Sequence, residues 1–304
     1  MATRARRLRA LLRTGAAAVL GLSLATTAVA ATTPAAQAPS APASPAPRLL
    51  SLAPGLTEIA YAAGAAGLLV GTVEYSYYPA AAKQLPRVGD AWRVDYERAL
   101  ALRPDVVLAW ETGTPAATIA QLRRLGLRVV EVSTRNLADV PAALRQLGRV
   151  AGTEASAEAA ARAFETRIAL QRERYASRPK LSVFIEIDDE PVYTVNGRHV
   201  ISEIVALCGG RNVFAGLPQL APPVATEAVL AADPQVILTT DDTIADPYVP
   251  WNRWPRLNAV RLRAVYRVPG DLVTRASPRL ADGVDATCAA LDRARAAYGV
   301  QAPK

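Results

Sequence analysis

A phrase of fifteen residues occurs twice in the chain, once in each half. YERALALRPDVVLAW begins at Tyr96 and TEAVLAADPQVILTT begins at Thr226, and each reads as a glutamate, an apolar helical run, a proline and a strand. The two glutamates and the two prolines are separated by the same interval, since 227 − 97 = 130 and 234 − 104 = 130. A chain that repeats a helix-to-strand unit in this way is expected to fold into two similar halves.

Short apolar strands alternate with helical segments on both sides of this repeat. In the first half we expect strands at 48–54, 68–73, 104–110 and 128–132, with helices at 56–67, 96–102, 115–125 and 137–150. The second half repeats the alternation with LSVFIEI, a helix ending at LCGG, the second phrase, the late strand RAVYRV and a final helix over 278–297. Strands and helices at this spacing predict parallel sheets covered on both faces.

A long Ala/Glu/Arg-rich segment at 153–177 separates the two halves. Its apolar positions Ala160, Phe164, Ile168 and Ala169 form one narrow stripe, which suits a helix that lies across two lobes. The predicted fold class is α/β, with two Rossmann-like lobes bridged by one long α-helix. Open α/β sheets bind ligands at the carboxyl ends of their strands, so a ligand cleft is expected between the lobes.

The first thirty residues predict a secretory signal peptide. A basic segment, MATRARRLRALLR, precedes a short apolar stretch and the small-x-small site Ala28-Val29-Ala30, so cleavage is expected after Ala30. Arg6-Arg7 leaves the twin-arginine and general secretory routes both open, and the lack of a nearby cysteine argues against a lipid anchor. The product is expected in the periplasm. The predicted parts are a signal peptide (1–30), an Ala/Pro-rich linker (31–47), an N-terminal lobe (48–152), a bridging helix (153–178) and a C-terminal lobe (179–304).

The formal net charge of +8 overstates the charge of the exported chain. Five arginines and no acidic residue leave with the signal peptide, so the net charge falls to 8 − 5 = +3. No basic run or basic-aromatic alternation follows, so no nucleic acid partner is expected. Cys208 and Cys288 are the two cysteines, and in an exported protein such a pair predicts one disulfide. Two buried free thiols are the alternative.

The sequence argues against catalysis and against a metal site. It contains no phosphate-binding loop, no dinucleotide fingerprint, no nucleophile elbow and a single histidine, His199. His199 follows a turn signal and is expected in a solvated loop. The acidic runs Asp188-Asp189-Glu190 and Asp241-Asp242 are expected at the surface, although the second could hold a cation.

Aromatic residues gather at the ends of the expected strands. They are Tyr75, Tyr77, Tyr78, Trp92, Trp110 and Tyr193. Tyrosine and tryptophan carry both an apolar ring and a polar group, so this placement favours a large and partly polar ligand. Ordinary packing between the lobes is the alternative.

Several segments together resemble the periplasmic cobalamin-binding proteins of ABC importers, which belong to the helical-backbone (class III) substrate-binding proteins. They are LAPGLTEIAYAAGAAGLLVGTVEYSYYPAAAKQLPRVGDAW, LRPDVVLAW, VALCGGRNVF and RASPRL, and the likeness extends from about Arg48 to the final helix. The resemblance implies a monomer without a cofactor of its own that captures a corrinoid and delivers it to a permease.

The resemblance also implies ligand contacts. Tyr75, Trp92 (with a shift of one residue) and Trp110 match aromatic cleft residues of one lobe, and Asp271 matches an aspartate that contacts the ligand. Tyr193 stands where the family has phenylalanine. The chain departs from the family at Ala221 and Leu272, where tryptophans are common; Trp251 and Trp254 are candidates to replace them, although Trp254 is expected to pack within WPRLNAV. The cysteine pair matches as well.

Other ligands and functions remain open at this stage. A haem binder of the same fold would need an iron ligand such as Tyr75, Tyr77, Tyr193 or His199. A ferric-siderophore binder would use cleft arginines, for which Arg93 and Arg198 are candidates. An exported α/β enzyme and a purely structural module fit the sequence less well.

The repeated glutamates, Glu97 and Glu227, have two interpretations. Each is expected in the first turn of a helix, where a carboxylate interacts favourably with the helix dipole. The resemblance implies a second role, in which the pair docks on matching positions of a two-fold symmetric permease in the inner membrane.

Overall fold

The computed structural model describes residues 46–90, 92–240, 242–243 and 245–299. The predicted signal peptide, nearly all of the predicted linker and Asp241 lie outside these ranges. In the part of the chain that the structure describes, no helix combines the length and the apolarity needed to cross a bilayer.

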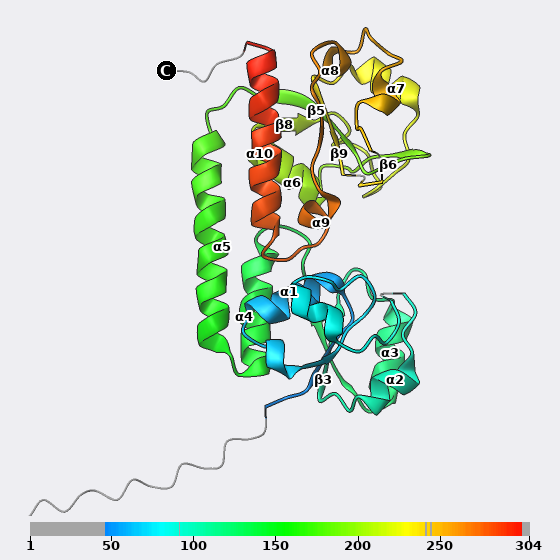
Figure 1. The fold of residues 1–304 in the computed structure, drawn as a ribbon, viewed down its shortest axis with the longest axis vertical. Coiled ribbons are helices and arrows are strands. Elements are labelled where there is room, and N and C mark those ends of the chain that lie inside the picture. Colours follow the sequence, from blue (N-terminus) through cyan, green and yellow to red (C-terminus); the bar gives the residue numbers. More distant parts are fainter. Residues whose placement is uncertain (1–45, 91, 241, 244, 300–304) are drawn as a thin grey trace, which may run out of the picture. The chain divides into compact units, whose positions relative to one another are not determined.

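The first half of the chain forms a four-stranded parallel sheet (Figure 1). Its strands are β1 (Leu49–Ser51), β2 (Leu69–Gly71), β3 (Val106–Trp110) and β4 (Arg128–Val132), in the order β2-β1-β3-β4. Alternate residues of the central strands enter different apolar clusters: Leu49 and Leu108 lie in one, and their neighbours Leu50 and Val107 in another. The sheet is therefore covered on both faces, as the sequence predicts.

The second half repeats this topology. Its parallel strands are β5 (Leu181–Glu186), β8 (Gly210–Asn212), β9 (Val236–Thr239) and β10 (Val265–Arg267), in the order β8-β5-β9-β10. In both sheets the first strand along the chain therefore lies between the second and the third, and the fourth is at the edge. A short antiparallel pair, β6 (Asp188–Asp189) and β7 (Val192–Tyr193), follows β5.

Helices connect the strands in each half. The first half contains α1 (Pro54–Ala62), α2 (Tyr96–Ala101), α3 (Ala116–Arg124) and α4 (Asp139–Ala151), with 3-10 turns at Ala66–Leu68 and Ala80–Gln84. The second half contains α6 (Val200–Leu207), α7 (Thr226–Ala232), α8 (Asn258–Arg261), α9 (Gly270–Val273) and α10 (Leu280–Ala297), with a 3-10 turn at Val249–Trp251. One apolar cluster runs from Leu108 of the first sheet through Phe164 to Val183 of the second.

The repeated phrase forms the same unit twice, as predicted. It becomes α2 followed by β3 in the first half and α7 followed by β9 in the second. Each helix is followed by a residue with a positive φ, 45° at Arg103 and 39° at Asp233, immediately before the repeated proline. Proline disfavours the right-handed helical conformation of the residue before it, so both helices end two or three residues before the repeated proline.

The long segment between the halves forms α5 (Glu154–Tyr175), which packs against α1 and α4 of the first half and against α6 and α10 of the second (Figure 1). Its buried residues are Ala157, Ala161, Phe164, Ile168 and Tyr175. The prediction that Ala169 belongs to the buried stripe is wrong, because a helix of 3.6 residues per turn turns that position to solvent. The expected lobe boundaries themselves stay a prediction.

Polar contacts connect α5 to both halves. Arg145 of α4 binds Glu158 and Glu165, and hydrogen bonds from Arg145 and Arg162 lower the pKa of Glu158 to about 2. In the second half of the chain, Asp285 of α10 binds Arg167 and Gln171 of α5. The helix is therefore attached by side chains at both ends as well as by its apolar stripe.

Candidate functional site

Trp110 ends β3 at the carboxyl edge of the first sheet. Its backbone N–H donates to the Thr114 hydroxyl at 2.9 Å, and a Cβ added to Gly113 would lie 1.8 Å from the indole ring. The glycine therefore permits the turn to press against the tryptophan. The indole Nε1 is buried and has no hydrogen-bond partner in the described part of the chain.

A cavity of about 80 Å³ joins Trp110 to residues of the second half. Its lining includes Gly55 at the start of α1 and Thr274, Arg275 and Ala276 after α9. Gly55 and Ala276 approach closely, since a Cβ on the glycine would lie 3.6 Å from the Ala276 carbonyl oxygen. The two halves therefore meet beside the predicted aromatic wall.

Arg275 brings two further predicted ligand contacts to this position. Its Nη2 lies 2.7 Å from Oδ1 of Asp271, and its Nη1 donates to the carbonyl oxygen of Tyr75 at 3.0 Å. Tyr75 has a φ of 64° and a side chain that is 63% exposed, so its ring is held outward by a left-handed backbone. Trp110, Asp271 and Tyr75 thus lie around one arginine.

A buried carboxylate that we did not predict stands behind this arginine. Glu58 of α1 accepts a hydrogen bond from Ser277 Oγ at 2.6 Å and lies 3.3 Å from Nη1 of Arg279. Burial raises the pKa of Glu58, while the Ser277 hydrogen bond and the two arginines act against that rise. The available signal was a lone acid within the apolar run LTEIAYAAG, together with the arginines of RASPRL.

The tyrosines after β2 cover these arginines. The Arg275 guanidinium lies 5.1 Å from the ring centroid of Tyr77, and the Arg279 guanidinium lies 4.1 Å from that of Tyr78. Both distances are within the range of cation–π contacts. Tyr77 and Tyr78 therefore help to hold the two halves together.

No hydrogen bond, ion pair or ring contact among the described residues joins Trp92 or Tyr193 to this group. Trp92 is 70% exposed, and its backbone N–H donates to Oδ1 of Asp90 at 2.7 Å. Hydrogen bonds from the backbone N–H groups of Arg93 and Trp92 lower the pKa of Asp90. Tyr193 is in β7, where its backbone bridges to Pro223 and so lies beside the Ala221-Pro222 segment. The ligand roles of both aromatics stay predictions.

Trp251 does not replace a missing tryptophan, because it is buried in the core, whereas a compensating role of Trp254 stays a prediction. Trp251 is 2% exposed, and its Nε1 donates to Oε1 of Glu186 at 3.1 Å, so it belongs to the core of the second half. Trp254 packs against Trp251 with ring centroids 5.4 Å apart. It precedes α8 rather than lying in it, so its packing was predicted correctly but its helical position was not.

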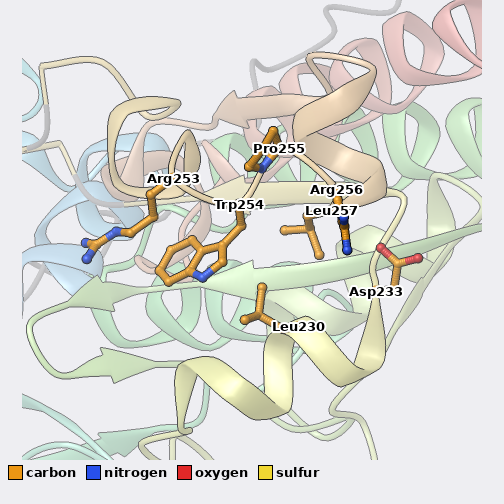
Figure 2. Close-up of a pocket in the computed structure, with 7 residues that line it drawn as sticks. All are labelled: Leu230, Asp233, Arg253, Trp254, Pro255, Arg256 and Leu257. Atoms are coloured by element: carbon orange, nitrogen blue, oxygen red, sulfur yellow. The ribbon is translucent and has the colours of Figure 1, made fainter.

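Trp254 also lines a groove of about 540 Å³ beside α7 (Figure 2). Arg253 lies over its indole at 4.7 Å, and Arg256 stands on the other side of Pro255. Asp233, at the end of α7, receives hydrogen bonds from the backbone and side-chain amides of Asn258. The groove therefore lies next to the helix that carries Glu227.

His199 is not the solvated loop residue that we expected. It is the N-cap of α6, where its Nδ1 accepts a hydrogen bond from the backbone N–H of Ile201 at 3.2 Å. Burial lowers its pKa to about 4. Arg198, a candidate contact for a ferric siderophore, donates a hydrogen bond to the Pro218 carbonyl oxygen. Within the described ranges, no three His, Cys, Asp or Glu residues are grouped so that they could hold a metal ion.

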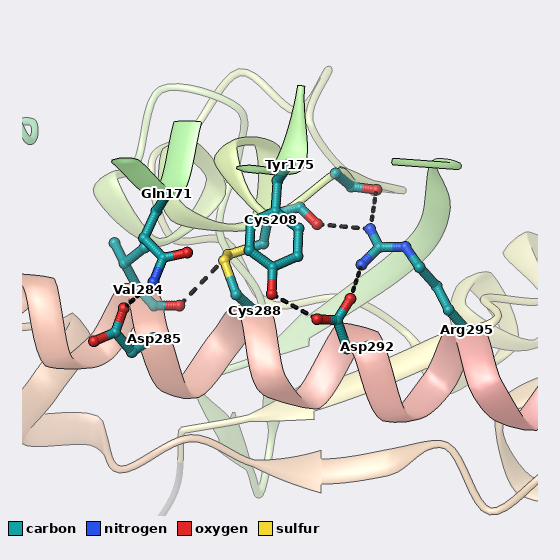
Figure 3. The surroundings of a disulfide bond; sticks show 9 residues. Gln171, Tyr175, Cys208, Val284, Asp285, Cys288, Asp292 and Arg295 are labelled. Atoms are coloured by element: carbon teal, nitrogen blue, oxygen red, sulfur yellow. Dashed lines mark hydrogen bonds and ion pairs between the residues drawn. A yellow bond between two sulfur atoms is a disulfide. The ribbon is translucent and has the colours of Figure 1, made fainter. Parts of the chain in front are cut away.

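The disulfide between Cys208 and Cys288 is present, which confirms that prediction (Figure 3). It joins the end of α6 to α10 across a separation of 80 residues. Nearby, Arg295 donates to the Cys208 carbonyl at 2.7 Å, and Tyr175 of α5 donates to Asp292 at 2.6 Å (Figure 3). The covalent bond therefore lies where α5, α6 and α10 meet.

Glu97 and Glu227 are both exposed and lie in the first turns of α2 and α7. The local environment of the two helices differs. Asp95 caps α2 by accepting a hydrogen bond from the Arg98 backbone N–H, whereas Ala225 has no polar side-chain atom that could cap α7. The two glutamates nevertheless share one position in the repeated unit.

The chain was compared with known proteins. Residues 49–272 match the protein family described as periplasmic binding protein. A vitamin B12-binding protein of Vibrio cholerae is 36% identical over 242 residues, which is 79% of this chain and 87% of that protein. One from Pectobacterium carotovorum is 36% identical over 248 residues, covering 80% of this chain and 88% of that protein.

Solved structures of periplasmic binding proteins also align with this chain. The crystal structure of the periplasmic vitamin B12-binding protein of Vibrio cholerae aligns with a TM-score of 0.77 and 36% identity, over 83% of this chain and 98% of that one. A periplasmic heme-binding protein from Roseiflexus aligns with a TM-score of 0.72 and 26% identity, over 82% of this chain and 99% of that one.

Proposed function

The chain belongs to the periplasmic binding protein family, and we propose that it captures cobalamin, or a related corrinoid, in the periplasm for an ABC-type permease. The observation that carries this proposal is the 36% identity with vitamin B12-binding proteins over four fifths of the chain. The heme-binding structure is also similar, but at 26% identity.

The site supports capture of a large ligand that carries amide groups. The indole and phenol rings of Trp110 and Tyr75 offer faces for an apolar macrocycle. The Asp271 carboxylate, which is 41% exposed, accepts hydrogen bonds from amides. Further contacts from Trp92 and Tyr193 are part of the proposal and rest on their match to the aromatic residues of the cobalamin-binding proteins. The chain itself supplies no reacting group in this scheme, so the ligand leaves unchanged.

The second candidate is haem, and the similarity to a heme-binding structure favours it. Haem requires an iron ligand, for which the exposed Tyr75 and Tyr77 are better placed than His199. The Nδ1 of His199 is occupied by the Ile201 N–H, and the side chain is partly buried.

Direct titration tests the proposal. Purified protein should quench its tryptophan fluorescence and release heat with cyanocobalamin at micromolar concentration, and it should bind haemin and ferric siderophores more weakly. Tight binding of haemin without binding of cyanocobalamin would overturn the proposal in favour of the second candidate.

Two substitutions then test the cleft. Trp110→Ala and Tyr193→Ala should each weaken cyanocobalamin binding by about tenfold or more, because each removes a stacking surface. Unchanged affinity in both variants, with native far-UV circular dichroism, would show that the ligand lies elsewhere.

A further inference from the structure

Two carboxylates from different halves of the chain approach the guanidinium of Arg275. Asp271 is the nearer, with its Oδ1 at 2.7 Å from Nη2. Glu58 lies on the inner side, with its Oε1 at 3.7 Å from Nη1. Their exposures differ greatly, since the Asp271 side chain is 41% exposed and the Glu58 side chain 2%.

Glu58 is held firmly where it can serve this arginine. Its Oε2 accepts the Ser277 hydroxyl and its Oε1 lies near Arg279, and both partners are more than 200 residues away in the sequence. Arg275, 14% exposed, also donates to the Tyr75 carbonyl. One mostly buried cation therefore connects Asp271, Tyr75 and Glu58.

A ligand that uses Asp271 changes the balance of charges around this cation. Amide N–H groups of the ligand compete with Arg275 for the carboxylate oxygens of Asp271. A guanidinium that is largely withdrawn from water is strongly destabilised when it loses its counter-ion. Arg275 would then move away from its position, and the backbone of Tyr75 would lose a hydrogen bond.

We infer that Glu58 is a positioning residue of the ligand cleft, acting as the second counter-ion of Arg275 when the ligand engages Asp271. The inference rests on the proposed function, in which Asp271 contacts the ligand. Glu58 touches no ligand in this scheme. It keeps Arg275 neutralised, and Arg275 in turn holds the carbonyl of Tyr75.

The alternative role for Glu58 is a passive link between the halves, and a double-mutant cycle separates the two. In the chain with Asp271 present, Glu58→Gln should weaken cyanocobalamin binding by about tenfold, because Arg275 has no carboxylate in the bound state. In an Asp271→Asn background the same substitution should change affinity less than about twofold. In the Asp271→Asn background, Arg275 has the same counter-ions before and after binding. Removing the Glu58 charge therefore adds no cost to ligand binding.

A passive link gives a different result, since Glu58→Gln would then weaken binding by the same factor in both backgrounds. That result would overturn the inference. Binding by Asp271→Asn that equals the wild type would overturn it too, because the ligand would then not engage Asp271. Wild-type protein that fails to bind cyanocobalamin would instead refute the proposed function, so the two failures are distinguishable.

A matched control uses another glutamate that joins the halves. Glu203 of α6 accepts a hydrogen bond from the backbone N–H of Leu137 at 2.9 Å and makes no contact with Arg275. Glu203→Gln should leave the affinity unchanged. Isothermal titration calorimetry measures the affinities, and thermal unfolding checks that each variant is folded.

If Glu58→Gln fails to fold, Glu58→Asp, which keeps the negative charge on a shorter side chain, replaces it in both backgrounds. A smaller loss that appears only with Asp271 present supports the inference, and an equal loss in both backgrounds contradicts it.

Discussion

His199 shows how tertiary packing changes the chemistry of one side chain. The turn signal before it predicts a solvated residue, but the ring caps α6 through Nδ1 and is partly buried. Burial disfavours the charged imidazolium, so the pKa falls from 6.5 to about 4. A histidine in this state accepts the Ile201 N–H only while it is neutral.

This shift makes stability depend on pH. Between pH 6.5 and about 4 the unfolded chain binds a proton at His199 and the folded chain does not. The stabilisation is therefore present above pH 6.5 and is lost as the pH falls to about 4, by up to about 3 kcal/mol. His199→Asn keeps a capping oxygen but does not titrate, so urea unfolding of this variant should depend less on pH across that window. An identical slope in both proteins would contradict the assignment.

Gly113 tests the orientation of Trp110. A methyl group at this position would overlap the indole, with the added Cβ at 1.8 Å from Cε3. Gly113→Ala should therefore displace Trp110 and weaken cyanocobalamin binding by about tenfold, as measured by calorimetry. Gly216→Ala is the control, because nothing lies within 4 Å of its added Cβ and its φ is not positive. Equal affinity in the two variants would show that the indole orientation does not matter.

At the scale of elements, the second half depends on the contact between α6 and α10. The disulfide and the Arg295 hydrogen bonds to Cys208 and Gly209 converge on the end of α6. The Tyr175–Asp292 hydrogen bond adds α5 to the same junction. The sequence predicts the cysteine pair, but the convergence of three helices on it depends on long-range packing.

Removing the disulfide should destabilise the protein without abolishing the ligand site. Closing a loop of about 80 residues is worth roughly 4.5 kcal/mol in the chain-entropy model. Cys208→Ala/Cys288→Ala should therefore unfold at a clearly lower urea concentration than the oxidised wild type, while its cyanocobalamin affinity at low temperature stays within about twofold. Dithiothreitol should destabilise the wild type and leave the double variant unaffected. A variant as stable as the wild type would contradict this estimate.

At the scale of the whole molecule, the repeat places one exposed glutamate in the corresponding helix of each half. The helix dipole explains a carboxylate in either first turn, but it does not require that the two copies share one position. A partner with two-fold symmetry would be matched by two such acids.

We predict that Glu97→Ala/Glu227→Ala binds cyanocobalamin normally and fails to support its uptake. The measurement is uptake of labelled cyanocobalamin by cells of the natural host in which the variant replaces the native copy. Glu154→Ala/Glu173→Ala is the matched control, because it also removes two exposed glutamates, both from α5. Normal uptake with the first variant would refute the docking role.

Much of the architecture could be predicted from the sequence, because the information is local. The alternation of apolar strands and helices, the prolines at 104 and 234 and the polar flanks of α5 act within a few residues, so the types of most elements and the burial of both sheet faces were predicted correctly. The short strands β6, β7 and β8 were not predicted, because two or three residues carry too little pattern. The position of Trp110 at the carboxyl end of a strand was predicted for the same reason, while its ligand role stays a prediction.

The rest was decided by tertiary structure. Glu58 lies 219 residues from Ser277 and 221 from Arg279, and no pattern in either segment specifies that the three meet. Trp251 was a candidate cleft residue by its type but became core, because Phe184 and Glu186 of β5 lie against it. The sequence by itself determined the two repeated lobes, the helix between them, the cysteine pair and the exposed glutamates. Only the packing of the two halves decided which charges are buried together, because the cost of burying a charge depends on neighbours that are distant along the chain.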